Sequence, residues 1–188
     1  MDEELNTTPF SSIYESFLSK ITDDMYMELT KEDTYKLLED LLISAIPKFE
    51  FPRVNLFDYV RGKDIVETTL DEVGNFETAN LYEVGYFNAE LSMEEINILA
   101  TYMVVEWLGQ QLASIENVRM KFSGTDFKFT SQANHMQKLL VIKKDYEREG
   151  FHLQRLYKRR APRKDGAPKS TLDIIMMPYK DRSDSNVD

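Results

Sequence analysis

The stretch LSMEEINILATYMVVEWLGQQLAS, residues 91–114, decides the fold. Ser92 followed three residues later by Glu95 is a capping-box pattern, and it directly precedes a dense apolar run. At about 100° per residue, the apolar side chains of a single helix fall on two separate arcs. The first arc holds Ile96, Ala100, Met103 and Trp107, and the second holds Ile98, Tyr102 and Val105.

A surface helix needs only one apolar stripe, so a helix with two is expected at the centre of a bundle or between its own core and a neighbouring subunit. We expect the first arc to pack on the other helices of the same chain. The second arc is expected to meet either the segment 51–90 or an adjacent subunit. We assign its residues, Ile98, Tyr102 and Val105, to subunit packing.

Composition limits the class of protein. The 188 residues, 42% hydrophobic and 30% charged, are enough for one domain with a real core. The absence of cysteine excludes disulfides, zinc–cysteine sites and thiol catalysis. The acidic N-terminus MDEELNTTPF does not resemble a signal peptide, and the longest apolar run is too short to cross a bilayer. We therefore expect a protein of the cytosol, or one assembled from it, without a membrane partner.

Charge is unevenly distributed along the chain. Residues 1–118 contain 7 Lys and Arg against 24 Asp and Glu, whereas residues 119–188 contain 16 against 9. Such halves repel their own kind and attract each other, which favours head-to-tail association of identical subunits. A monomer whose two ends neutralise each other is the equally weighted alternative.

Helical periodicity appears on both sides of a non-helical insertion. Apolar spacing predicts a first helix from Phe10 to Ile21, and a second one that begins after the N-cap Thr30 and ends near Ala45 before Pro47. Residues 51–90 lose the helical period. Three short aromatic or β-branched runs, 54–57, 65–69 and 82–87, indicate a small β excursion or ordered loop there.

A long last helix is expected after a cap at Thr130 or Ser131, weakened at Gly150. The proline-containing segment from Ala161 cannot continue it. The predicted fold is therefore mainly α, a bundle of about four helices with a small β or loop insertion at about 51–90. Residues 1–160 form one domain, and residues 161–188 form an extended C-terminal arm.

The chain shows no arrangement that requires catalysis. His135 and His152 lie seventeen residues apart, without the spacing of a metal site. Adjacent carboxylates such as Glu39 and Asp40 stand where a solvated helix face would place them. The run Arg61-Gly62-Lys63 lacks the spaced glycine of a phosphate loop. We expect no enzymatic activity, no catalytic residue, no metal and no cofactor.

A basic segment begins at Arg155 and is the clearest charge feature. Clustered Lys and Arg can displace counterions from phosphates, so residues 155–169 could serve a small nucleic-acid-binding or regulatory module. The acidic remainder of the chain would repel a duplex. We prefer an arm that docks on an acidic surface of a partner or of the next subunit, with a solvated tail as the third possibility.

Three blocks of sequence together resemble a known family. They are LTKEDTYKLLEDLLISAIPKFEF from Leu29, LSMEEINILATYMVVEWLGQQL from Leu91, and MKFSGTDFKFTSQANHMQKLLVIKKDYEREGFHLQRLYKRR from Met120. This pattern is similar to head–tail connector proteins of tailed bacteriophages, the neck or adaptor subunits between portal and tail. The resemblance covers residues 29–160 and is strongest over 91–160, with the stretch SGTDFKFTSQANH at its centre.

The resemblance implies a structural virion protein of the neck, assembled in the host cytoplasm into a ring, usually of twelve subunits. It implies contacts with the portal protein and with the next neck or tail ring, around a lumen through which genomic DNA passes without sequence-specific binding. It also implies a C-terminal segment that engages the portal. The residues that we assign to this contact are Arg155, Lys158, Arg159, Arg160, Arg163, Lys164, Leu172, Ile174, Ile175 and Met176.

Overall fold

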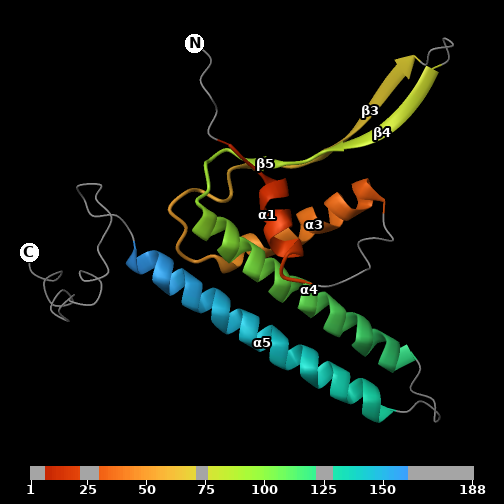
Figure 1. Cartoon of the computed structure of the whole chain (residues 1–188). Coiled ribbons are helices and arrows are strands. Elements are labelled where there is room, and N and C mark those ends of the chain that lie inside the picture. The colour runs from red at the N-terminus through yellow and green to blue at the C-terminus, as the bar shows by residue number, and fades with distance from the viewer. Residues whose placement is uncertain (1–6, 22–29, 71–75, 122–128, 161–188) are drawn as a thin grey trace, which may run out of the picture.

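The computed structural model describes residues 7–21, 30–70, 76–121 and 129–160, and its described part is mainly helical (Figure 1). The helices are α1 (Phe10–Leu18), α3 (Lys31–Ala45), α4 (Met93–Lys121) and α5 (Phe129–Arg159), with a 3-10 turn at Ile46–Lys48. The prediction of a mainly α fold with about four helices and a small β insertion is confirmed. The predicted C-terminal arm, residues 161–188, lies outside the described residues.

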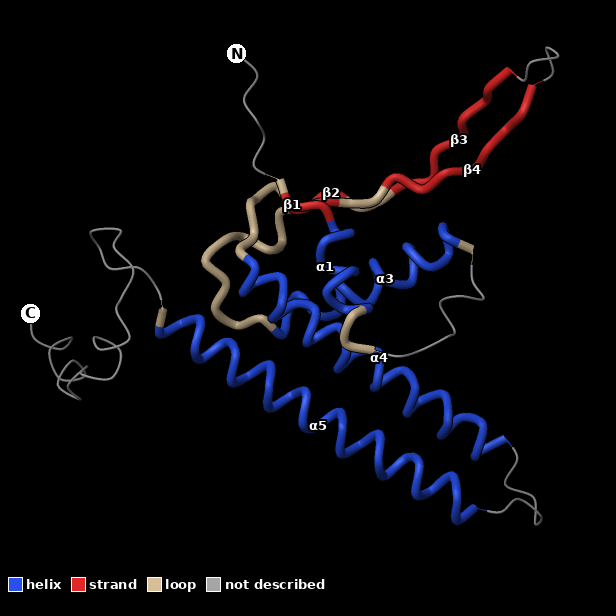
Figure 2. Tube along the Cα trace, viewed as in Figure 1, coloured by secondary structure: helices blue, strands red, loops and turns tan. Residues whose placement is uncertain are grey.

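Helix α4 is the centre of the arrangement (Figure 2). Helices α1 and α3 pack against it, and α5 runs antiparallel along it as the second arm of a long helical hairpin. Its N-terminus carries the predicted capping box, because the backbone N–H of Ser92 donates to Glu95 Oε2 at 2.8 Å and that of Glu95 donates to Ser92 Oγ at 3.4 Å. The expectation of a helix at the centre of a bundle is thereby confirmed.

Both apolar arcs of α4 are buried by the chain itself. The first arc packs inward except for Trp107, which is only half-buried. The second arc differs from our expectation. Ile98, Tyr102 and Val105 are all buried within the single chain, where Tyr102 contacts α5 through Gln154 and Ile98 lines a small pocket with residues of α5. These three side chains therefore belong to the intrachain core and present no free surface to a neighbouring subunit.

The first two helices follow the sequence pattern closely. In α1 the buried side chains are Phe10, Ile13, Tyr14 and Phe17. Helix α3 begins as predicted, since Thr30 Oγ1 accepts the backbone N–H of Asp33 at 3.2 Å. It ends at Ala45, two residues before Pro47, and the chain continues as the 3-10 turn. Ile46 keeps helical dihedral angles, φ −49° and ψ −50°, so the α-helix ends because Pro47 has no backbone N–H to donate to the preceding turn.

The insertion supplies every strand but β1 of two small antiparallel sheets. The first has the strand order β1-β5-β2, formed by β1 (Thr8–Pro9), β5 (Tyr86–Phe87) and β2 (Tyr59–Val60). The second is a hairpin of β3 (Lys63–Leu70) and β4 (Phe76–Glu83), with Lys63 opposite Glu83 and Leu70 opposite Phe76. This hairpin projects away from the helices (Figure 2). The run 54–57 follows the ordered-loop alternative, because it is a turn in which Asn55 Oδ1 accepts the N–H of Phe57.

Helix α5 is longer and more continuous than the sequence suggested. It begins at Phe129 and passes through Gly150 without interruption to Arg159. A Cβ atom at position 150 would lie 2.8 Å from Tyr102 Cζ, closer than real side chains approach. Gly150 is therefore required where the Tyr102 ring of α4 crosses α5, and this close packing offsets the low helix propensity of glycine.

Candidate partner-binding surfaces

The C-terminal end of α5 carries the described part of the predicted basic segment. Arg155, Lys158, Arg159 and Arg160 are all exposed there. The other residues assigned to portal binding lie outside the described part of the chain: Arg163, Lys164, Leu172, Ile174, Ile175 and Met176. The structure thus places four of the predicted site residues together at one helix end.

Tyr157 anchors this helix end to the body. Its buried hydroxyl donates to Glu95 Oε1 and accepts the backbone N–H of Arg53 at 3.2 Å. The Arg53 guanidinium in turn donates to the Tyr157 carbonyl at 2.7 Å and lies 3.9 Å from the tyrosine ring centroid. Burial, followed by the hydrogen bond to Glu95, raises the pKa of Tyr157. One side chain therefore ties α5 to the start of α4 and to the loop after the 3-10 turn.

Gln154 provides a second anchor, one turn earlier on α5. Its side-chain amide donates to the Lys48 carbonyl at 2.9 Å and to the Tyr102 hydroxyl, while its oxygen accepts the N–H of Glu50 at 2.8 Å. A buried amide needs such a complete set of partners. Together with Tyr157, it fixes the rotation of α5 about its own axis, because both anchors lie on the same face of the helix.

Three of the four basic side chains have contacts within the chain. Arg160 forms an ion pair with Glu94, and Lys158 Nζ lies 3.9 Å from the ring centroid of Phe51. Arg155 lies more loosely over Phe151, at 6.0 Å from the ring centroid. Exposed pairs of this kind are worth about 1 kcal/mol or less. The helix thus fixes the backbone of the basic end, whereas the basic side chains make only weak contacts within the chain. Such contacts can be replaced by contacts with another protein.

A second organised region joins the β3–β4 hairpin to α3 through Glu39. This carboxylate is 2% exposed, and it accepts from Arg61 Nε at 2.7 Å, from the Gly62 N–H at 2.9 Å and from the Tyr82 hydroxyl at 2.8 Å. Our assignment of Glu39 to a solvated helix face was wrong, although its neighbour Asp40 is exposed. Tyr82 of the hairpin and the two residues that precede β3, Arg61 and Gly62, bring the donors to Glu39, and no local sequence pattern could have indicated them.

An aromatic stack extends this connection. The Tyr82 ring of β4 stacks on Tyr35 of α3, with centroids 6.3 Å apart and planes inclined by 24°. Burial and the hydrogen bond to Glu39 raise the pKa of Tyr82. Lys36 and Asp64 close the same junction with an ion pair of 2.7 Å. The base of the hairpin is therefore fixed, so the hairpin leaves the body in a defined direction.

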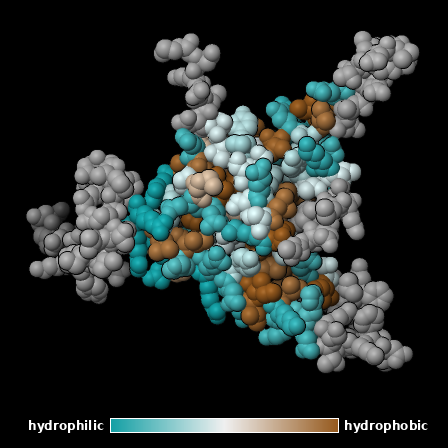
Figure 3. All heavy atoms as spheres, in the orientation of Figure 1, coloured by the Kyte–Doolittle hydropathy of each residue, from teal (hydrophilic) through white to brown (hydrophobic). Residues whose placement is uncertain are grey.

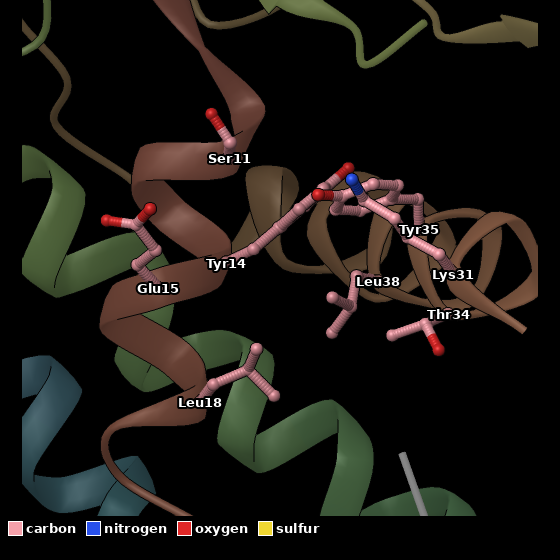
Figure 4. A pocket seen from close by; sticks show the side chains of 8 residues that line it. All are labelled: Ser11, Tyr14, Glu15, Leu18, Lys31, Thr34, Tyr35 and Leu38. Atoms are coloured by element: carbon pink, nitrogen blue, oxygen red, sulfur yellow. The ribbon is translucent and has the colours of Figure 1, made fainter. Parts of the chain in front are cut away.

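A pocket of about 400 Å³ lies between α1 and α3 (Figure 4). The residues that line it are Ser11, Tyr14, Glu15, Leu18, Lys31, Thr34, Tyr35 and Leu38. Figure 4 shows the side chains of Tyr14 and Tyr35 directed toward each other from the two helices. The buried Tyr14 hydroxyl has no hydrogen-bond partner among the described residues. Burial, with Glu39 as the next cause, raises the pKa of Tyr14.

The described residues offer no metal-binding cluster and no membrane-spanning helix. They contain no group of three or more His, Asp or Glu side chains placed to hold a metal ion. No described helix is long and apolar enough to cross a membrane. Comparison with protein-family models, curated proteins and solved structures found no match to this chain.

Proposed function

We propose that this chain is a non-catalytic structural subunit that forms a ring at the head–tail interface of a tailed bacteriophage, bridging portal and tail around the DNA channel. The observation that carries the proposal is the anchored basic end of α5. Tyr157 and Gln154 fix this helix end through buried hydrogen bonds, so that Arg155 and Arg159 face solvent from a rigid support. A merely solvated tail would need no such anchoring.

The charge of the remaining surface supports the same function. The described residues before α5 contain 9 Lys and Arg against 16 Asp and Glu, whereas α5 contains 7 against 3. An acidic wall repels phosphates, which would let DNA pass through a lumen without tight contacts. The basic helix end is then available for an acidic surface on the portal or on the neighbouring ring, where complementary charge sets the encounter rate and the specificity.

Binding of the full-length protein to purified portal rings tests the proposal. We expect wild type to bind, and the double variant Arg155→Glu/Arg159→Glu to lose most of this binding. A matched control, Lys31→Glu/Lys63→Glu, makes the same change in net charge on the α3 and hairpin side, and it should bind like wild type. The proposal is wrong if wild type does not bind portal rings, or if both double variants bind equally well.

Exposed cations at one helix end also favour a second candidate, a small nucleic-acid-binding or regulatory module that uses residues 155–169. It predicts affinity for duplex DNA that falls steeply with salt, because each neutralised phosphate releases counterions. The connector proposal predicts weak binding or none. A salt titration with a duplex, carried out on wild type and on Arg155→Glu/Arg159→Glu, separates the two functions.

A further inference from the structure

The β3–β4 hairpin stands largely by itself. It packs against the rest of the described chain mainly through α3 at its base, where Tyr82 stacks on Tyr35. A two-stranded ribbon is only marginally stable in water, and it usually needs a third strand or a helix against one face. Because its base is fixed, the hairpin holds its other face away from the body in a defined direction (Figure 1).

The face of the hairpin that is turned away from α3, its outer face, combines carboxylates with apolar side chains. Side chains alternate along a strand, and Tyr82 points to α3, so its neighbours Leu81 and Glu83 lie on the outer face. The strand register places Ile65 opposite Leu81 and therefore adds Glu67, two residues along β3, to the same face. Leu81 is 41% exposed, and the exposed Glu67 has no ion-pair partner among the described residues.

The hairpin is also the most acidic of the described elements. Its two strands contain 1 Lys against 4 Asp and Glu in 16 residues, whereas the other described residues before α5 contain 8 against 12 in 86. The opposite charge gathers at the C-terminal end of α5, where residues 155–160 contain four Lys and Arg and no carboxylate. Among these four cations, Arg159 has no ring or carboxylate partner within the described chain, and Phe51 beside Lys158 is 42% exposed. Figure 3 shows hydrophobic residues among hydrophilic ones both on the hairpin and next to this helix end.

We infer that the outer face of the hairpin binds the basic C-terminal end of α5 in a second copy of this chain. The two surfaces lie on opposite sides of the body (Figure 1), so they meet between copies and not within one chain. In this contact the unpartnered Arg159 faces the unpartnered Glu67, and Phe51 supplies apolar surface for Leu81. Two different surfaces that meet in this way make a head-to-tail contact, which repeats around a ring or along a filament.

The inference deepens the proposed function, because it names the contact between subunits of the ring, but its test needs no phage component. The predicted portal contact begins at the same helix end and continues over residues 163–176, which lie outside the described part of the chain. The subunit contact therefore uses only the first part of the basic segment.

Self-association measured by sedimentation velocity at low salt tests the contact. We expect wild type to associate at high protein concentration. Glu67→Lys and Arg159→Glu should each weaken association at least about tenfold, because each brings like charges together. The combined variant Glu67→Lys/Arg159→Glu restores opposite charges and should recover association to within about threefold of wild type. Glu15→Lys on α1 and Lys144→Glu on α5 are matched controls, because they make the same changes in charge at exposed positions, and they should associate like wild type.

The inference is wrong if wild type stays monomeric at its highest soluble concentration, if either single variant associates like wild type, or if the combined variant associates no better than the single ones. Circular dichroism should show unchanged secondary structure in every variant, as expected for exposed positions. The portal experiment fails separately. Self-association through this contact by a protein that does not bind portal rings would support the interface and contradict the proposed function, and portal binding by a protein that stays monomeric would do the reverse.

Discussion

Helices α4 and α5 are nearly equal in length, 29 and 31 residues, and they run side by side, yet they are held in place by different forces. Helix α4 buries apolar side chains on most of its surface between Ile96 and Leu108. Among the described residues of α5, only Gly150, Gln154 and Tyr157 are buried. The first helix is fixed by apolar burial on most sides. The second is fixed by a single apolar face, with Leu139, Tyr146 and Leu153 against the core, and by polar anchors near its C-terminal end.

This difference means that one set of contacts supplies most of the folding free energy, whereas another sets the orientation of α5. Apolar burial supplies most of the free energy of folding, but it is not directional. Hydrogen bonds from Gln154 and Tyr157 contribute less net free energy, and they require defined geometry. Helix α5 can therefore present its basic end in a fixed orientation while most of its described residues remain at least partly exposed.

The largest expected effect is a core truncation in α4. Leu99→Ala should lower the free energy of unfolding by about 2–5 kcal/mol, because Leu99 is fully buried and its removal leaves a cavity. The same substitution at Leu140 of α5 should cost less than about 1 kcal/mol, since that side chain is already partly in water. Urea denaturation of both variants measures the contrast. Equal losses would contradict the distinction between the two helices.

The second largest effect is expected from removing the Glu95 carboxylate, which links α4 to Tyr157 of α5. Glu95→Ala should lower the free energy of unfolding by about 2–4 kcal/mol, because it removes a helix cap and leaves the buried Tyr157 hydroxyl without its acceptor. Its neighbour Glu94 makes an exposed ion pair with Arg160, so Glu94→Ala should cost at most about 1 kcal/mol. Thermal and urea unfolding compare the pair. A cost at Glu94 as large as that at Glu95 would show that the buried network is not the stronger link.

The two helix-interior glycines should respond in opposite directions. Gly150→Ala should destabilise by about 1–3 kcal/mol, because the added methyl group overlaps the Tyr102 ring. Gly109→Ala should stabilise by about 0.5–1 kcal/mol, since its nearest neighbour, Lys143 Cε, lies at an ordinary 3.6 Å and alanine favours the helix. Chemical denaturation of the two variants gives the sign of each change in the free energy of unfolding. A stabilising Gly150→Ala would mean that the helices do not cross as closely as described.

The smallest effect is expected at Tyr14, away from both long helices. Tyr14→Phe should change stability at neutral pH by about 1 kcal/mol or less, because the buried hydroxyl that it removes has no hydrogen-bond partner in the described structure.

The dependence of stability on alkaline pH gives a second test of Tyr14. Burial raises the pKa of Tyr14 in the folded protein. The protonated hydroxyl therefore contributes fully to folding stability below the ordinary tyrosine pKa of about 10, and this contribution is lost as the pH rises further. Stability of wild type should therefore fall above pH about 10. Tyr14→Phe should fall less steeply in unfolding curves recorded across this range. Identical alkaline slopes would contradict this account of Tyr14.

Local sequence patterns were sufficient for elements whose ends and faces depend on near neighbours. The capping box at Ser92 and Glu95, the Thr30 cap and the stop before Pro47 all involve residues within a few positions of one another. The candidate surface was only partly predictable. The cluster at Arg155 and Arg159 is visible in composition, but its anchoring depends on contacts between residues about 50 to 100 positions apart, such as Gln154 with Lys48 and Tyr102.

The sequence by itself determined the mainly helical fold, the central helix with two apolar arcs and the charge difference between the two parts of the chain. Only the tertiary structure decided what covers the second arc. Periodicity shows that Ile98, Tyr102 and Val105 require burial, but a partner helix and a neighbouring subunit satisfy that requirement equally well. Packing of α5 settles the question, because Gly150 lets α5 approach Tyr102 closely. Apolar side chains of α5 itself, Leu140, Val141, Ile142 and Phe151, stay exposed.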